Sequence, residues 1–157
     1  MTTNTPTPEI RLASLGIQLP SAPEPFGAYV ETVQTGNLLF LTGMLATSGR
    51  TVAMTGIAGK NLDMETGRKA AALAALNAIA LAKKQLGSLS RVRRVVRLGV
   101  YIAATPEFTE HPKLADGASE LLRDVFGADK MSSRLVFGVA SLPLGSPVEL
   151  EVILEVE

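Results

Sequence analysis

The chain has 157 residues, 46% of them hydrophobic, and its 15 basic and 15 acidic side chains give a formal net charge of zero. This length and composition predict one domain with a sizeable core, and the balanced charge argues against non-specific binding of nucleic acid, which normally needs a basic excess. Because cysteine is absent and His111 is the one histidine, the sequence excludes disulfides and thiolate chemistry and argues against a histidine-based triad or a multi-histidine metal site.

The sequence carries no signal for a membrane segment or a cofactor. Its first ten residues, MTTNTPTPEI, lack the apolar core of a signal peptide, and no run reaches the ~18 apolar residues of a transmembrane helix. The glycines at 56 and 59 are not followed by the Gly-Lys-Ser/Thr of a phosphate-binding loop. We therefore expect a soluble cytoplasmic protein with neither cofactor nor metal, whose chemistry rests on arginine, acidic, tyrosine, lysine and hydroxyl side chains.

Residues 1–20 are predicted to form a polar tail and a short helix, ahead of a single domain over residues 21–157. Thr7 and Pro8 are a typical helix cap and first-turn pair, so we expect one or two helical turns over 9–15, ended by Gly16. A proline-rich loop is expected over 21–28. Two strands over 28–34 and 37–43, joined by the turn Thr35-Gly36, and a short strand over 51–55 are expected next.

The longest helix is expected over residues 61–86. Asn61 or Asp63 can cap its start, Gly87 ends it, and its many alanines indicate a helix that lies close against a sheet. Residues 91–103 alternate in the manner of a strand. A second long helix is expected over 112–126, with Asp116 off its apolar stripe.

The last two strands are expected over 134–140 and 148–156, paired as a hairpin across the SLPLGSP link. The whole order predicts an α+β fold in which roughly six mostly antiparallel strands carry both long helices on one face. The opposite face would still carry apolar residues among its charges, namely Val95, Gly99, Tyr101, Val136 and Ile153. Such a face is too apolar to be wholly solvated, so we expect it to form a subunit interface with polar pockets.

Arg134 and Glu149 are the candidate chemical groups, because each begins one of these last two strands. Arginine offers a planar fork of donors suited to a carboxylate, and a glutamate in the same pocket can hold or activate a water. The alternative is a structural ion pair or two unrelated solvated charges. In the predicted hairpin Arg134 lies opposite Ile153, which leaves Glu149 about 13 Å away along the strand. A direct contact between them would therefore form more easily between subunits.

Other polar residues are expected to be structural. Four arginines between residues 91 and 97 form the one basic cluster, and strand alternation divides them between two faces, which favours a solvated or interface stripe over an RNA-binding patch. His111 precedes Pro112 at a helix start, so we expect a surface or cap residue rather than a catalytic one.

Several segments together resemble a known family. The stretch S-R-L-V-F-G-V-A-S-L-P, followed by V-E-L-E at 148–151, resembles the C-terminal signature of the RidA/YjgF family of reactive-intermediate (enamine/imine) deaminases, also named endoribonuclease L-PSP. The segment G-N-L-L-F-L-T-G and the alanine-rich helix follow in the family order, so the resemblance extends from about Tyr29 to the end of the chain. The longer N-terminus and the segment D-G-A-S-E-L-L-R-D-V-F-G resemble a divergent, chorismate-mutase-like subgroup.

The resemblance implies a chorismate-mutase-like fold assembled as a homotrimer, with sites in the clefts between subunits. The family arginine, here Arg134, would bind the substrate carboxylate, and Glu149 would position the water that attacks the C=N carbon. Tyr29 and Gly43 would line the pocket. The products would be a 2-oxo acid and ammonia.

Two further pocket positions depart from the family pattern. Asp116 matches a position commonly occupied by asparagine, and Val136 matches one that is often cysteine in the deaminases. The leading hypothesis is hydrolytic deamination of 2-imino and enamino acids. Asp116 motivates an alternative, a non-catalytic trimer that binds small carboxylates. RNA cleavage, the activity in the family's older name, is disfavoured because the chain has zero net charge and only seven aromatic residues for stacking.

Overall fold

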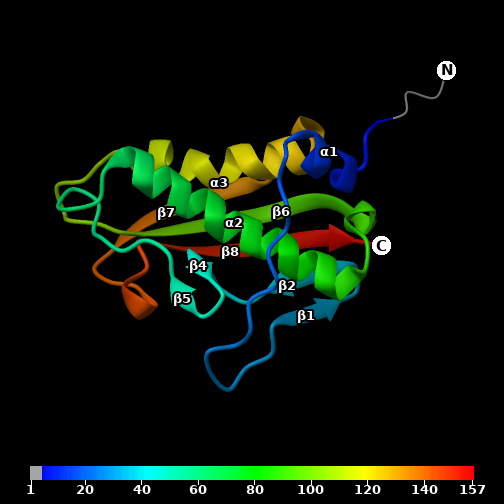
Figure 1. The fold of residues 1–157 in the computed structure, drawn as a ribbon, viewed down its shortest axis with the longest axis horizontal. Coiled ribbons are helices and arrows are strands. Elements are labelled where there is room, and N and C mark those ends of the chain that lie inside the picture. Colours follow the sequence, from blue (N-terminus) through cyan, green and yellow to red (C-terminus); the bar gives the residue numbers. More distant parts are fainter. Residues whose placement is uncertain (1–4) are drawn as a thin grey trace.

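The computed structural model describes residues 5–157 as a helical layer on one face of a mixed sheet (Figure 1). The helices of this part of the chain are α1 (Pro8–Ser14), α2 (Met64–Leu86) and α3 (His111–Phe126), with short 3₁₀ turns η1 (Leu89–Arg91), η2 (Ala128–Lys130) and η3 (Pro143–Gly145). The six-stranded sheet contains β1 (Thr32–Thr35), β2 (Leu38–Leu41), β3 (Met44–Leu45), β6 (Val92–Ala103), β7 (Ser133–Val139) and β8 (Val148–Val156). A separate ribbon pairs β4 (Thr47–Ser48) with β5 (Thr51–Val52).

The strand order of the sheet is β1-β2-β8-β6-β7, and β3 also pairs with β8. The predicted hairpin between the last two strands is wrong, because β6 lies between them. β7 pairs with β6 in parallel and places Arg134 opposite Leu98, whereas Ile153 on β8 lies opposite Arg97. The reason is that α3 connects β6 to β7, and two strands joined through a helix can lie parallel and side by side. All other pairs in the sheet are antiparallel, as expected.

Helix α2 begins three residues later than predicted. The side chain of Asp63 caps it by accepting a hydrogen bond of 2.8 Å from the backbone N–H of Thr66, while the side chain of Asn61 instead accepts from the backbone of Ile57. The helix ends at Gly87, whose φ of +77° suits glycine. Its buried face consists largely of alanines, which allows the helix to lie close to the sheet. No helix in residues 5–157 combines the length and apolarity needed to cross a membrane.

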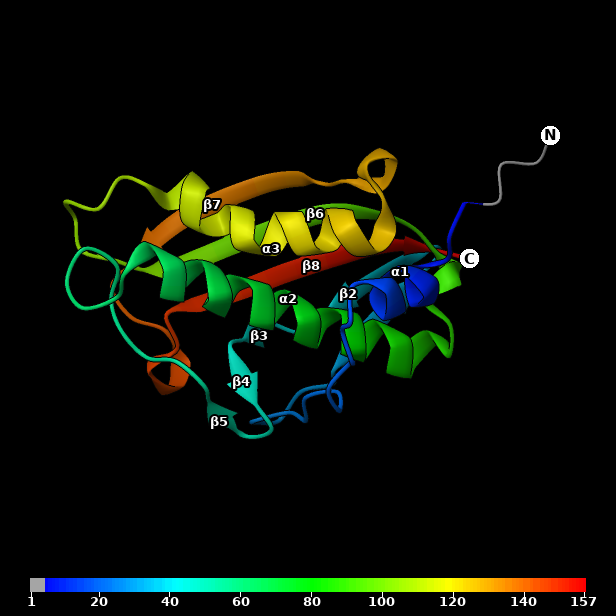
Figure 2. The ribbon, with the colours of Figure 1, turned by 45° about the horizontal axis from the view of Figure 1, so that its top comes forward.

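Helices α2 and α3 run side by side across the sheet (Figure 2). They touch at two glycines, since a Cβ at Gly117 would overlap the backbone carbonyl of Arg68 and a Cβ at Gly67 would overlap the side chain of Leu114. The guanidinium of Arg68 also pairs with Glu120 at 2.7 Å. This close contact fixes the position of α3, and therefore of the polar residues that α3 presents to the sheet edge.

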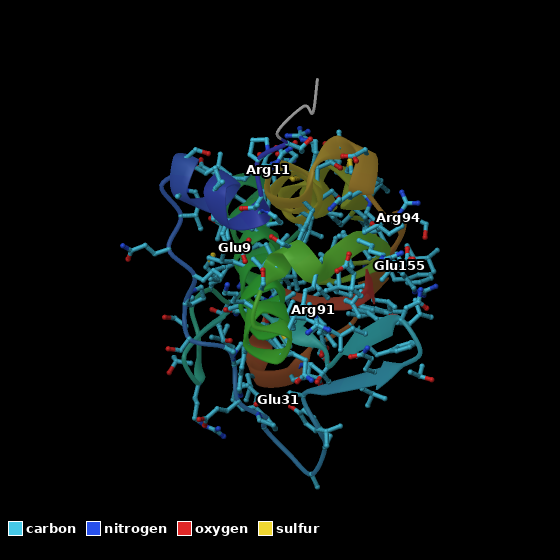
Figure 3. All side chains as sticks on the ribbon, turned by 90° about the vertical axis from the view of Figure 1, so that its right-hand side faces the viewer. Glu9, Arg11, Glu31, Arg91, Arg94 and Glu155 are labelled. Atoms are coloured by element: carbon cyan, nitrogen blue, oxygen red, sulfur yellow. The ribbon has the colours of Figure 1, made fainter. Side chains whose placement is uncertain are left out.

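The short N-terminal helix is held to the rest of the fold by Glu9. Thr7 caps α1, as predicted, and the Glu9 carboxylate accepts hydrogen bonds from the backbone N–H of Leu89 at 2.7 Å and from Lys83 at 3.0 Å. Although partial burial opposes ionisation, these hydrogen bonds leave the pKa of Glu9 lowered. Figure 3 shows Glu9 at this junction between α1 and the end of α2. Leu12 of α1 is buried in the same core as the sheet.

The second face of the sheet is partly apolar, as predicted, but its membership differs. Two irregularities in the pairing of β6 with β8 shift the alternation, so Val95 turns to the core. Val136 also packs against the core, because it lies opposite the buried Val100. The face carries Val33, Phe40, Tyr101, Leu135, Phe137 and Ile153 together with an Arg97–Glu151 ion pair of 3.5 Å. Phe137, stacked on Tyr101 with ring centroids 6.0 Å apart, is 49% exposed.

Candidate functional site

A cavity of about 290 Å³ brings together Tyr29, Gly43 and Glu149. Glu149 is the second residue of β8, where it lies opposite Leu45 of β3 and Tyr101 of β6. Gly43 immediately precedes β3. Tyr29 stands in the loop before β1, and its hydroxyl accepts a hydrogen bond of 2.9 Å from the backbone N–H of Phe26.

The carboxylate of Glu149 is the polar centre of this cavity. Burial raises its pKa above the ordinary 4.5. A Cβ at Gly43 would collide with Oε1 of Glu149 and would lie 3.2 Å from its Cδ. Glycine at 43 is therefore needed for the carboxylate to lie against the backbone. A half-buried carboxylate with a raised pKa is a suitable base for a water molecule.

The rest of this cavity is mostly apolar, and sequence reasoning did not identify several of its residues. Phe26 from the proline-rich loop and Leu144 from the turn before β8 both line it. Leu144 adopts a φ of +59° and is 55% exposed, which is unusual backbone strain for a branched residue at the margin of a cavity. The Pro-Leu-Gly sequence indicates a turn, but it does not reveal which residue adopts the strained conformation.

Asn77 is a further residue that sequence reasoning missed. It is 2% exposed in the alanine-rich face of α2, and its amide donates to the backbone carbonyls of Leu45 at 3.1 Å and Thr47 at 2.9 Å. Leu45 and Thr47 line the Glu149 cavity, so Asn77 supports the wall of that cavity from behind. A single polar residue on an otherwise apolar helix face was the available signal.

A second cavity of about 180 Å³ contains Arg134 and Asp116. Nη1 of Arg134 donates to Oδ1 of Asp116 at 2.7 Å and to Oγ of Ser119 at 3.0 Å, and Nη2 donates to the carbonyl of Pro112 at 3.4 Å. The Arg134 side chain is 24% exposed. Because Arg134 lies opposite the buried Leu98, its side chain points to the helical layer. Asp116 and Ser119 are both on α3 and meet it there.

One chain therefore does not bring Arg134 and Glu149 together. They lie on β7 and β8 with β6 between them, and they project from opposite faces of the sheet. Within one chain these two residues do not form an ion pair, because the acidic partner of Arg134 is Asp116. Val136 lines neither cavity, so its contact with a ligand stays a prediction.

The chain matches the family described as "YjgF/chorismate mutase-like, putative endoribonuclease" over residues 9–156. It belongs to this family. It is 39% identical to protein TCP17 of Trypanosoma cruzi over 92% of this chain and 91% of that protein. It is 31% identical to a 2-iminobutanoate/2-iminopropanoate deaminase of Dermatophagoides farinae over 90% of this chain and 95% of that protein. A crystal structure of a "putative endoribonuclease" from Shewanella oneidensis superposes with a TM-score of 0.92 at 32% identity, covering 96% of this chain and all of that one.

In this YjgF-family protein the four arginines near the start of β6 have acidic or carbonyl partners. Arg97 pairs with Glu151, and Arg93 lies 4.0 Å from Glu157. Arg91 and Arg94 donate to backbone carbonyls. Figure 3 shows Arg91, Arg94 and Glu155 at the same end of the molecule, so acidic and basic groups are mixed there. His111 begins α3 and packs edge-on against Phe108 with ring centroids 4.9 Å apart.

Proposed function

We propose that this protein hydrolyses 2-imino acids, and their enamino tautomers, to 2-oxo acids and ammonia in clefts between the subunits of a homotrimer. The observation that carries the proposal is the Glu149 cavity, in which a carboxylate with a raised pKa lies against Gly43 beneath apolar walls. The deaminase relative, 31% identical over nine-tenths of the chain, supports the same reaction class.

The reaction needs few groups, because an imine carbon is already electrophilic. Water adds to the C=N carbon, so a C–O bond forms while the π electrons move to nitrogen. Glu149 accepts the proton lost by the water and returns it to the nitrogen. The hydroxyl proton of the carbinolamine then passes to the nitrogen, by way of Glu149, while the oxygen forms the C=O bond and the C–N bond breaks. Ammonia is released and the 2-oxo acid remains. Orientation of the imine beside a held water is the main contribution required of the protein.

The binding of the substrate carboxylate is assigned to Arg134, and this requires a second copy of the chain. Within one chain Arg134 and Glu149 occupy different cavities on opposite faces of the sheet. A neighbouring subunit seated on the apolar sheet face, where Phe40, Leu135 and Phe137 are exposed, would bring an Arg134 to a Glu149. Light scattering should give a mass three times that of the 16.5 kDa chain. A monomer at all concentrations would contradict the shared site.

The activity is tested by generating a 2-imino acid with an amino-acid oxidase and following its decay in the presence of the protein. Glu149→Gln should lower kcat by about 10²-fold or more, because it removes the base. Arg134→Ala should raise KM by about tenfold or more, because a charge-assisted hydrogen bond is lost. Glu155→Gln, the same change farther along β8, is the matched control and should retain activity. An unchanged rate of imine decay with wild-type protein would overturn the proposal.

Mixed assemblies test whether the site is shared. Arg134→Ala and Glu149→Gln chains, each weakly active alone at substrate concentrations below KM, should recover about a quarter of wild-type activity under those conditions when refolded together in equal amounts. This fraction is the chance that an intact Arg134 meets an intact Glu149 across one interface. No recovery from well-formed mixed trimers would indicate that both residues must come from one chain.

A second candidate is a non-catalytic protein that binds small carboxylates. The observation in its favour is the Arg134–Asp116 ion pair of 2.7 Å, which neutralises the arginine intended for the substrate. Binding of pyruvate or 2-oxobutanoate without any acceleration of imine decay would favour this function. RNA cleavage, suggested by the names of some relatives, has less support because Arg93 and Arg97 of β6 lie beside Glu157 and Glu151, and Arg94 donates to the carbonyl of Asp129.

A further inference from the structure

The guanidinium of Arg134 is only partly occupied. Of its five N–H groups, the two on Nη1 donate hydrogen bonds to Asp116 and Ser119, and one on Nη2 donates to the carbonyl of Pro112. Among residues 5–157, nothing accepts from Nε or from the second N–H of Nη2. In a planar guanidinium Nε–H is parallel to one N–H of Nη2, so this edge of the guanidinium presents a fork that fits one carboxylate.

The charge around this fork is already balanced. Arg134 and Asp116 are the only charged side chains among the described residues that line the 180 Å³ cavity, and together they have no net charge. Asp116 is 46% exposed, and only its Oδ1 is hydrogen-bonded to Arg134. The cavity of about 180 Å³ is large enough for a small ligand.

We propose that Asp116 is a specificity determinant, which makes the site prefer a carboxylate accompanied by a positively charged nitrogen over a plain carboxylate anion. The inference rests on the proposed function, in which Arg134 binds the carboxylate. An anion that joins the Arg134–Asp116 pair leaves the cavity with a net negative charge. A ligand that carries both a carboxylate and a cationic nitrogen leaves it neutral.

This preference distinguishes the substrate from the product of the proposed reaction. A protonated 2-imino acid is a neutral zwitterion, and its addition of water yields a 2-oxo acid anion and an ammonium ion. The site would thus bind the reactive, protonated imine and release the anionic product once the positive nitrogen has left. With asparagine at 116 the arginine would keep its full charge, and the product anion would be held more tightly.

The test uses two ligands with the same carbon skeleton, 2-aminobutanoate and 2-oxobutanoate, and measures Kd by calorimetry on the assembled protein. In wild type 2-aminobutanoate should bind more tightly than 2-oxobutanoate. Asp116→Asn keeps the hydrogen-bonding oxygen and removes the charge, so it should shift the ratio of the two Kd values by about tenfold or more toward 2-oxobutanoate. Asp124→Asn, the same change on the same helix beside Arg123, is the matched control and should not shift the ratio.

A further variant separates charge from positioning. Ser119→Ala loosens the guanidinium without altering the charge, so the ratio of Kd values should remain that of wild type. An equal shift in Ser119→Ala, or an unchanged ratio in Asp116→Asn, would overturn the charge-selection inference while leaving carboxylate binding intact. If wild type binds neither ligand, or if Arg134→Ala binds both normally, the assignment of Arg134 in the proposed function fails as well, and the inference fails with it.

Discussion

Replacement of Gly43 by alanine should separate catalytic activity from stability. The added Cβ would lie 3.2 Å from Cδ and 3.5 Å from Cγ of Glu149, and nearer still to Oε1. To recover an ordinary contact of ~3.5 Å, the carboxylate must move by about 1 Å. If Glu149 holds the attacking water, as proposed, a displacement of that size should lower kcat/KM by about 10²-fold. The free energy of unfolding should fall by about 1 kcal/mol or less, because the group that moves is the end of a flexible side chain.

Gly36→Ala is the matched control, and it should lower stability without lowering activity. Gly36 lies in the β1–β2 turn with a φ of +57° and open space around its Cα, so alanine should cost about 1 kcal/mol through backbone strain alone. It should leave imine hydrolysis unchanged. Both variants are compared by urea unfolding and by the imine-decay assay. Wild-type kcat/KM in Gly43→Ala, or an equal loss of activity in Gly36→Ala, would refute the view that Gly43 acts by placing the Glu149 carboxylate.

Three further predictions concern the pKa of Glu149, the cavity wall and the N-terminal helix. Burial raises the pKa of Glu149, so the stability associated with its protonated form is full below pH ~4.5 and is lost as the pH rises through the folded-state pKa. The free energy of unfolding of Glu149→Gln, measured with urea, should therefore equal that of wild type at pH ~4 and exceed it at pH ~7. If the two proteins were equally stable at both pH values, the carboxylate would not be destabilised by burial. Asn77→Ala should lower the free energy of unfolding by about 2 kcal/mol, because the carbonyl of Thr47 loses its hydrogen-bond donor. It should also reduce activity, and full activity would contradict the role of Asn77 in supporting the cavity wall. Glu9→Ala should lower the free energy of unfolding by about 1 kcal/mol, because the hydrogen bond from the backbone N–H of Leu89 is lost. Imine hydrolysis should be unchanged, and a loss of activity would show that α1 contributes to the site.

The helices and long strands could be predicted from the sequence, but the pairing of the strands could not. Caps, glycine stops and alternation are local signals, and they located α2, α3, β6 and β8 to within a few residues. The strand that pairs with β7 depends on which edge of the sheet, that of β8 or that of β6, is available to it. A turn-like link between two consecutive strands, here SLPLGSP, favours a hairpin. The long β6 nevertheless offers β7 a parallel edge beneath α3, and this link is long enough to cross β6.

The candidate site was predicted as a set of residues rather than as an arrangement. Tyr29, Gly43 and Glu149 meet in one cavity, which local patterns alone would not indicate because the three positions are far apart in sequence. The charge partner of Arg134 escaped prediction for a related reason. It depends on the parallel register that turns Arg134 to the helical layer, where Asp116 lies.

Gly117 follows Asp116 directly, at the point where α3 touches the backbone of α2. Any side chain there would push the two helices apart and would carry the acid at 116 away from the arginine. An aspartate at this position in a relative is therefore not enough to reproduce the neutral pair. In relatives, the dipeptide Asp-Gly, rather than the aspartate alone, would therefore identify sites that select their ligand by charge. Relatives without it would present an unpaired arginine that binds any small anion.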